Sequence, residues 1–385
     1  MSESALLSPV WSLLIVGTAL AIATAILRYS PFFRKEIGTG GGRSLLQLDG
    51  LRGYMALAIY MSHAAAFPHW FAAGHWDFAP STYYVLIGTV SVSMFFMTTG
   101  FLFWGKALRS GKHFSVIPLA ASRLRRLAPL YLFSMPFFWL LVAHRTGWTL
   151  RTDLGSFFES VSQWLALGIG GRPAINGYAD TWVINAPTWT LWYEWMFYIS
   201  LPILTLASGL IGTLVIGFAA IAWCWNTGNE FAVLSLFAGT LAAHFFHRWP
   251  DLEFMRGRFA ACVALLLVVG IGIGHFERYG VWHTLLLTPL FVVVCYGNDL
   301  FGTLSYAPAR LIGGISYSIY LAHALLLHAS MYWVNAVRPL IEMTGLEFWS
   351  VIAGVTIVLV AISTMTFRFV EYPWMKPARR VTGVG

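Results

Sequence analysis

Long apolar runs recur along the chain and are separated by short polar segments. A run of about 17–25 apolar residues can cross a bilayer as one α-helix, and a helix bonds its backbone polar groups within its own segment. The pattern predicts eleven spans, near residues 10–27, 54–72, 83–105, 127–143, 188–207, 210–225, 231–247, 259–274, 281–297, 312–334 and 348–367. The predicted fold class is therefore all-α, a polytopic transmembrane helical bundle.

Composition agrees with this pattern. The 385 residues are 58% hydrophobic and 10% charged, and the mean hydropathy is +0.69. A soluble domain carries roughly a quarter charged residues. So few charges imply that most helices face lipid, and membrane lipids are expected partners.

Charge predicts the orientation. The first apolar run has no basic residue before it and Arg28 after it, which favours a retained first span with an outside N-terminus over a cleaved signal peptide. This topology places the C-terminus in the cytoplasm with 19 of the 24 Lys and Arg residues inside. The five outside are Arg145, Arg151, Arg172, Arg278 and Arg338. The net charge of +8 is then explained by the positive-inside rule and an anionic ligand, without nucleic acid.

The chain divides into three parts. Residues 1–43 form an extra N-terminal span and a cytoplasmic Gly-rich linker, residues 44–376 a ten-helix core, and residues 377–385 a cytoplasmic tail. The glycines of the linker are not followed by Lys and Ser or Thr, so a flexible linker is favoured over a phosphate loop. Residues 144–187 form the longest outside segment, in which Leu154–Gly171 is predicted to be an interfacial or re-entrant helix.

Three ionisable residues lie well inside predicted spans, where such groups mark functional sites. At about 1.5 Å per residue, His63 and His323 lie roughly 15–16 Å above the inner face, and Glu194 roughly 21 Å above it. The three are predicted catalytic residues in one cavity near the midplane. The alternatives are histidines that pack against neighbouring carbonyls and a glutamate that pairs with an arginine to fix helix register.

Such a cavity suits acyl transfer to an alcohol. A neutral imidazole removes the hydroxyl proton, and a carboxylate on the other ring nitrogen fixes the tautomer. Which histidine pairs with Glu194 is left open. No metal is expected, because the buried carboxylate is single.

Arginines gather at the predicted inside face. Arg123 and Arg126 are three residues apart and share one side of a helix, and guanidinium forks suit phosphate. The alternative is ordinary positive-inside charge. Their position beneath His63 favours an anionic donor.

Six motifs follow one another from about residue 44 to 376. They are Leu48-Asp-Gly-Leu-Arg52-Gly followed by His63, Phe95-Phe96-Met-Thr-Thr99-Gly100-Phe101, Arg123-Leu-Arg-Arg126-Leu-Ala-Pro129-Leu-Tyr131, Trp189-Thr-Leu-Trp-Tyr-Glu194-Trp-Met-Phe-Tyr198, Gly314-Ile-Ser316-Tyr317-Ser-Ile-Tyr320-Leu-Ala-His323 and Phe367-Arg-Phe-Val-Glu371-Tyr-Pro373. Together they resemble the motifs of the integral-membrane acyltransferases of the third acyltransferase family. Thr99 and Thr190 stand where serine is usual.

The resemblance implies a bacterial inner-membrane enzyme that moves an acyl group, usually acetyl, from cytoplasmic acyl-CoA to a hydroxyl reached from outside. His63 would be the central catalytic residue, and Arg52, Arg123 and Arg126 would bind the CoA end. The motif residues Tyr198, Trp189, Tyr317 and Tyr320 are expected to bind substrate. The acceptor would be a carbohydrate, a glycolipid or a hydroxylated small molecule. Trp182, Trp189 and Trp192 are suited to stack on sugar rings.

Other functions and mechanisms stay open at this point. A transporter or flippase of a glycan or lipid would also use polar groups near the midplane, and a homologue that only senses or scaffolds is the third hypothesis. For the chemistry, direct attack with His63 as base is favoured over an acyl-histidine intermediate. Acetyl or a longer acyl group, the acceptor, and a homo-oligomeric state are left open.

Overall fold

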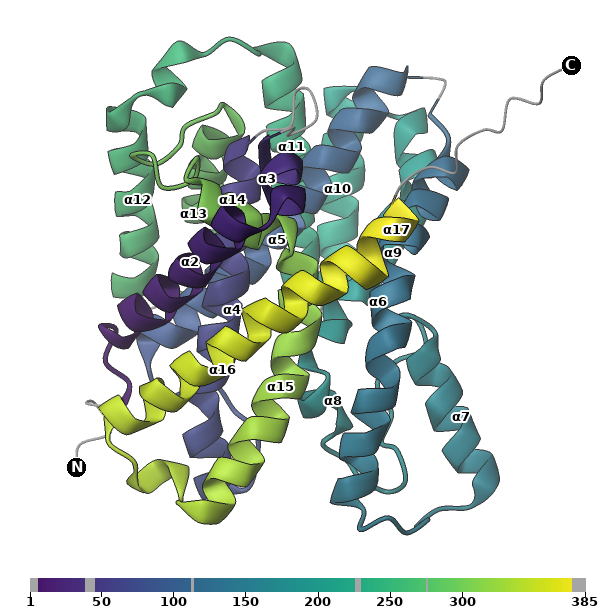
Figure 1. Cartoon of the computed structure of the whole chain (residues 1–385). Coiled ribbons are helices and arrows are strands. Elements are labelled where there is room, and N and C mark those ends of the chain that lie inside the picture. The colour runs from purple at the N-terminus through teal and green to yellow at the C-terminus, as the bar shows by residue number, and fades with distance from the viewer. Residues whose placement is uncertain (1–5, 39–45, 112–113, 226–229, 275, 376–385) are drawn as a thin grey trace, which may run out of the picture.

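The structure is a computed structural model that describes residues 6–38, 46–111, 114–225, 230–274 and 276–375, and these residues fold as helices and connecting loops (Figure 1). The predicted glycine run beyond Gly38, the tail at 377–385 and the basic residues Arg43, Lys112, Lys376, Arg379 and Arg380 lie outside the described ranges. The α-helices are α2 Trp11–Tyr29, α3 Pro31–Gly38, α4 Leu46–Ala73, α5 Thr82–Ser110, α6 Val116–Arg145, α7 Leu154–Leu165, α8 Thr181–Ile184, α9 Trp189–Leu206, α10 Leu210–Trp225, α11 Glu230–Arg248, α12 Arg258–Ile273, α13 Val281–Cys295, α14 Ala307–Gly314, α15 Ser316–Val337, α16 Gly345–Thr366 and α17 Tyr372–Met375. Short 3-10 helices cover Ala186–Thr188, Glu253–Arg256 and Leu340–Glu342, and a π-helical turn covers Phe367–Glu371.

The predicted all-α class is confirmed, and each of the eleven apolar runs coincides with a helix or, for the run at 312–334, with the pair α14 and α15. Judged by length and composition, four helical segments of the described chain can cross a membrane: α2, α5, α6 and Gly345–Met375. The pair α14 and α15 makes a fifth if it is one span, whereas α10, α12 and α13 are apolar but shorter. These apolar helices identify an integral membrane protein. The count of eleven spans and the outside N-terminus stay predictions.

Short helices and loops lie at the two opposite ends of the helical bundle. Figure 1 shows α3, α14 and α17 toward one end of the molecule and α7 and α8 at the opposite end. The central helix α4 packs against α5, α14 and α15. Of the 28 residues of α4, 17 are buried, including Met55, Ile59 and Tyr60, so this helix runs through the inside of the bundle.

Glycines allow the helices around α4 to approach closely. A Cβ on Gly313 of α14 would lie 1.7 Å from the carbonyl oxygen of Asp49, and one on Gly53 would lie 2.4 Å from that of Ala309. The pair α5 and α11 is built in the same way, because a Cβ on Gly100 would lie 2.2 Å from the carbonyl oxygen of Leu236. Small residues that bring backbones together are typical of membrane helix packing.

The helix pair α14 and α15 is bent by 69°. The break falls at Ile315, directly after Gly313 and Gly314. The bend starts α15 inside the bundle and aims its first turn at the helices that carry the arginines.

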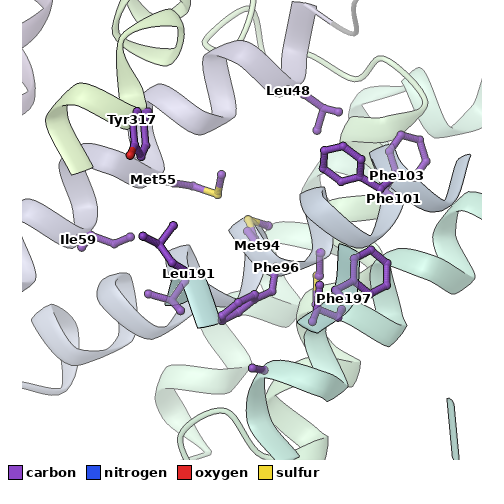
Figure 2. Packing of buried hydrophobic residues seen from close by; sticks show 14 of the residues in the cluster. Leu48, Met55, Ile59, Met94, Phe96, Phe101, Phe103, Leu191, Phe197 and Tyr317 are labelled. Atoms are coloured by element: carbon purple, nitrogen blue, oxygen red, sulfur yellow. The ribbon is translucent and has the colours of Figure 1, made fainter. Parts of the chain in front are cut away.

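Apolar side chains from distant segments join in two buried clusters. Figure 2 shows part of the first, in which Met55 and Ile59 of α4 lie near Met94 of α5 and Leu191 of α9. The second cluster joins α2 to α4, α14 and α16, with Ile15, Ala19 and Ala23 of α2 buried. The N-terminal helix is therefore packed on the core.

The long segment between α6 and α9 folds back on the end of the bundle. Its helix α7 begins with the Asp153 carboxylate, which accepts a hydrogen bond from Ser156 N at 2.9 Å, and buries only Trp164. The helix ends at Leu165 rather than at the predicted Gly171, because Leu167 and Gly168 adopt positive φ. The indole of Trp164 donates to Pro173 O at 2.9 Å, which fixes the returning loop.

Candidate functional site

Two histidines from distant parts of the chain meet near the middle of the bundle. His63 Nδ1 lies 3.0 Å from His323 Nε2, and His323 Nδ1 lies 3.1 Å from Ile319 O. A carbonyl oxygen only accepts, so His323 carries its proton on Nδ1 and its Nε2 is an acceptor. For two neutral rings, His63 must then donate from Nδ1. This order leaves the Nε2 lone pair of His63 free to take a proton.

The two rings differ in their access to space. His323 is fully buried, whereas His63 lines a cavity of about 880 Å³. The ring of Trp76 meets the ring of His63 edge-on, with centroids 6.0 Å apart. His63 is therefore the member of the pair that a substrate can reach, and His323 orients it from behind.

Glu194 does not share a cavity with His63, although its predicted depth in the membrane suggested that it would. Its carboxylate accepts a hydrogen bond from the Tyr198 hydroxyl at 2.7 Å and lines a second, smaller cavity of about 120 Å³. The orienting partner of His63 is another histidine rather than a carboxylate. The depth of a residue gives only its height in the membrane, whereas the rotation of its helix decides which cavity its side chain faces.

The smaller cavity collects positive charge. It is lined by Arg52 of α4 and by Arg123 and Arg126 of α6. The Arg123 guanidinium lies over the Phe103 ring, 4.1 Å from its centroid, a stacking that fixes an arginine without neutralising it. Arg125, which points the other way, is exposed. The one-face placement expected of Arg123 and Arg126 is thus observed, together with Arg52.

Three of the four tyrosines and tryptophans expected to bind substrate line this small cavity. Tyr198 lies beside Glu194, Tyr317 donates its hydroxyl to Leu127 O at 2.9 Å, and the Tyr320 hydroxyl lies 3.0 Å from that of Thr190. The fourth, Trp189, lines the large cavity instead.

The large cavity is aromatic and lies among the loops at the α7 and α8 end. Its wall includes Trp76, Trp182, Trp189, Trp192, Tyr193 and Tyr279, together with the glycine-rich loop 168–171 and Arg172. Burial lowers the pKa of the Arg172 guanidinium from its ordinary value and raises that of the Tyr279 phenol. Flat rings and a few polar groups of this kind suit a carbohydrate or another ring-bearing polar molecule.

The two cavities adjoin at one residue. Val92 of α5 lines both, and it is the only described residue that does so. We name the large one the outer cavity and the small one the inner cavity, after the predicted sidedness of the chain. His63 faces the outer cavity, and the arginines face the inner one.

Comparison with known proteins gives the family of the chain. The family model described as an acyltransferase domain, acyltransferase 3, matches residues 45–368. This chain belongs to that acyltransferase family. Membership implies acyltransferase activity, and the matched region contains both cavities.

The chain is similar in sequence to the exopolysaccharide production protein ExoZ of Rhizobium meliloti (strain 1021). The two are 25% identical over 253 residues, which cover 62% of this chain and 76% of ExoZ. No solved structure matches.

Several residues of this family member were missed by sequence reasoning. Val92 and Trp76 line the cavities, but each reads as an ordinary apolar or interfacial residue in its own segment. Ser316, which lines the inner cavity, belongs to a motif but has no role assigned from sequence. In the sequence, Arg172 stands out only as one of the outside charges, although the glycines before it are typical of a tightly packed loop. Across the described ranges, no three His, Cys, Asp or Glu side chains are grouped so as to hold a metal ion.

Proposed function

We propose that the protein transfers an acyl group, acetyl as the first choice, from cytoplasmic acyl-CoA to a hydroxyl of an extracytoplasmic carbohydrate or glycolipid. The observation that carries this proposal is the position of His63, which contacts His323 and lines an aromatic outer cavity that adjoins, at Val92, an inner cavity with three arginines. The protein would work in the bacterial inner membrane.

The proposed reaction is one direct transfer. The acceptor hydroxyl gives its proton to His63 Nε2 as its oxygen attacks the thioester carbon, and the C–S bond breaks. The leaving thiolate then takes the proton from the imidazolium, so that the products are the ester and CoA. His323 accepts the Nδ1–H of His63 throughout, which holds the ring and stabilises its positive charge.

The spacing of the donor groups fits CoA. Along the continuous helix α4, Arg52 and His63 are eleven residues apart, a rise of roughly 16 Å. From the pyrophosphate to the sulfur, the pantetheine arm has about thirteen bonds, which span about 16 Å at the length per bond of an extended backbone. A phosphate held at Arg52, Arg123 and Arg126 thus puts the thioester beside His63.

The inner cavity is too small to enclose the whole donor. At about 120 Å³ it is below the roughly 300–1,000 Å³ of sites that enclose a drug-sized ligand. The narrow arm would enter it while the nucleotide stays at the arginines. Glu194, next to Tyr198, would belong to this donor side, because it lines the same cavity as the three arginines.

The aromatic outer cavity supports a sugar acceptor. Trp76, Trp182 and Trp192 offer flat faces for sugar rings, and the similar protein ExoZ is named for exopolysaccharide production. We therefore place the acceptor among polysaccharides or their lipid-linked precursors.

The test is ester formation by the purified protein. Vesicles with the protein receive radiolabelled acetyl-CoA and de-esterified surface polysaccharide from the bacterium that carries the gene. We expect alkali-labile label on the glycan and one CoA released per ester. A transporter or flippase would move glycan without releasing CoA, and that result would refute the proposal.

A further inference from the structure

The hydroxyl of Ser316 has no hydrogen-bond partner among the described residues, although the side chain is only 1% exposed. Buried polar groups are nearly always bonded, so such a hydroxyl requires an explanation. In helices, Ser and Thr usually donate to the carbonyl four residues earlier, as Thr98 and Thr240 do here at 2.8 and 2.9 Å.

The bend before α15 removes this acceptor from Ser316. Four residues earlier lies Ile312, which belongs to α14 on the other side of the 69° break. Ser316 is therefore the first residue of a helix whose preceding turn has turned away. Its hydroxyl is left for another partner.

The inner cavity supplies the space for that partner. Ser316 lines it together with Arg52, Arg123 and Arg126. Other buried serine hydroxyls also lack a partner in the described chain, among them Ser93, Ser235 and Ser363, but none of these lines the inner cavity. Among the buried serine hydroxyls without a partner in the described chain, the one on Ser316 is therefore the one that borders the inner cavity.

Distance along α15 indicates which group it would meet. Ser316 is seven residues before His323, a rise of roughly 10 Å. On a pantetheine arm, the second amide carbonyl lies about eight bonds from the sulfur, which is about 10 Å in extended form. Arg52 is eleven residues from His63 on α4, a longer rise of roughly 16 Å that matches the phosphates.

We propose that the Ser316 hydroxyl donates a hydrogen bond to the second amide of the pantetheine arm and so sets how far the donor reaches. This inference rests on the proposed use of acyl-CoA. Ser316 acts by positioning the thioester, and it takes no part in the proton transfer at His63.

The experiment uses three thioesters on the full-length protein in vesicles. Acetyl-CoA carries the phosphates and both amides, acetyl-pantetheine carries both amides, and acetyl-N-acetylcysteamine carries only the first. For Ser316→Ala we expect KM to rise about 3- to 10-fold, the value of one neutral hydrogen bond, for acetyl-CoA and acetyl-pantetheine. The KM for acetyl-N-acetylcysteamine stays unchanged.

The matched control is Ser363→Ala, which removes another buried hydroxyl without a partner in the described chain, outside the inner cavity. It should leave the KM values for all three thioesters unchanged. A rise for acetyl-CoA alone would assign Ser316 to a phosphate and overturn the proposal, as would an equal rise for all three donors. Wild-type protein that uses none of the thioesters would refute the acyltransferase function itself.

Discussion

At the scale of single residues, the proton order of the histidine pair decides what His63 can do. Ile319 O fixes the Nδ1 proton of His323, and His323 Nε2 in turn receives the Nδ1 proton of His63. The arrangement has the form of a base and its orienting partner, with a neutral imidazole in place of a carboxylate. A neutral partner stabilises the imidazolium less than a carboxylate would.

His323→Ala should therefore lower kcat by about 100-fold, the usual size of a general-base effect, because His63 loses its orientation. The KM for acetyl-CoA should stay within twofold, since the arginines proposed to bind the donor are untouched. Steady-state kinetics with acetyl-CoA measure both. Because the cavity left by alanine can loosen the fold, His323→Gln, which keeps an acceptor oxygen, should retain more activity. Equal kcat in wild type and both variants would exclude the orienting role.

The sequence predicted the contacts of the individual site residues only in part. Depth along the helices brought His63 and His323 to one level, and the structure puts them in contact. The same reasoning gave Glu194 as a partner for a histidine, but the α9 helix directs its side chain to Tyr198 and the inner cavity. Ser316 stood in a motif without a role, because the role proposed for it depends on a bend that hydropathy does not record.

At the scale of elements, close contact between α4 and α14 holds Arg52 in the inner cavity. The backbone at Asp49 rests on Gly313 with no room for a side chain. The sequence predicted both helical regions from their apolar runs. It did not predict the break at Ile315, because the run at 312–334 contains no charged residue or proline and is apolar enough overall to be taken as one span.

Gly313→Ala should separate α4 from α14, since its Cβ would overlap the Asp49 carbonyl. Overpacking costs about 1–3 kcal/mol, which corresponds to a fall of roughly 2–12 °C in the thermal midpoint. Thermal unfolding in detergent measures it. The neighbouring Gly314→Ala is the control, because its Cβ would meet only Ile37 Cδ1 at 3.8 Å. Equal thermal midpoints for the two variants would show that α4 and α14 can move apart at Gly313 without a loss of stability.

At the scale of the whole molecule, two cavities approach from opposite ends of the bundle and adjoin at Val92. The apolar pattern predicts a bundle but no cavity, because a cavity depends on which helices are neighbours and how each is rotated. A reaction across the membrane needs such a passage, since acyl-CoA and the acceptor are proposed to come from opposite sides.

Val92→Phe should close this passage. We expect acyl transfer to fall at least about tenfold, while CoA binding to the arginines changes less than twofold, because a larger side chain fills the shared wall. Transfer to glycan and binding of CoA are measured on the same preparation. Val358→Phe, on an exposed face of α16, makes the same substitution away from the cavities and should leave both unchanged. Undiminished transfer in Val92→Phe would place the passage elsewhere.

The central claim is that His63 is the base of an acyl transfer, and one comparison of two variants tests it most directly. His63→Ala and His69→Ala remove histidines from the same helix, but only His63 lines the outer cavity. The measurement is acetyl ester formed on de-esterified polysaccharide from radiolabelled acetyl-CoA by each purified variant in vesicles. We expect no ester above background with His63→Ala and a wild-type amount with His69→Ala. Wild-type ester formation by His63→Ala would contradict the account.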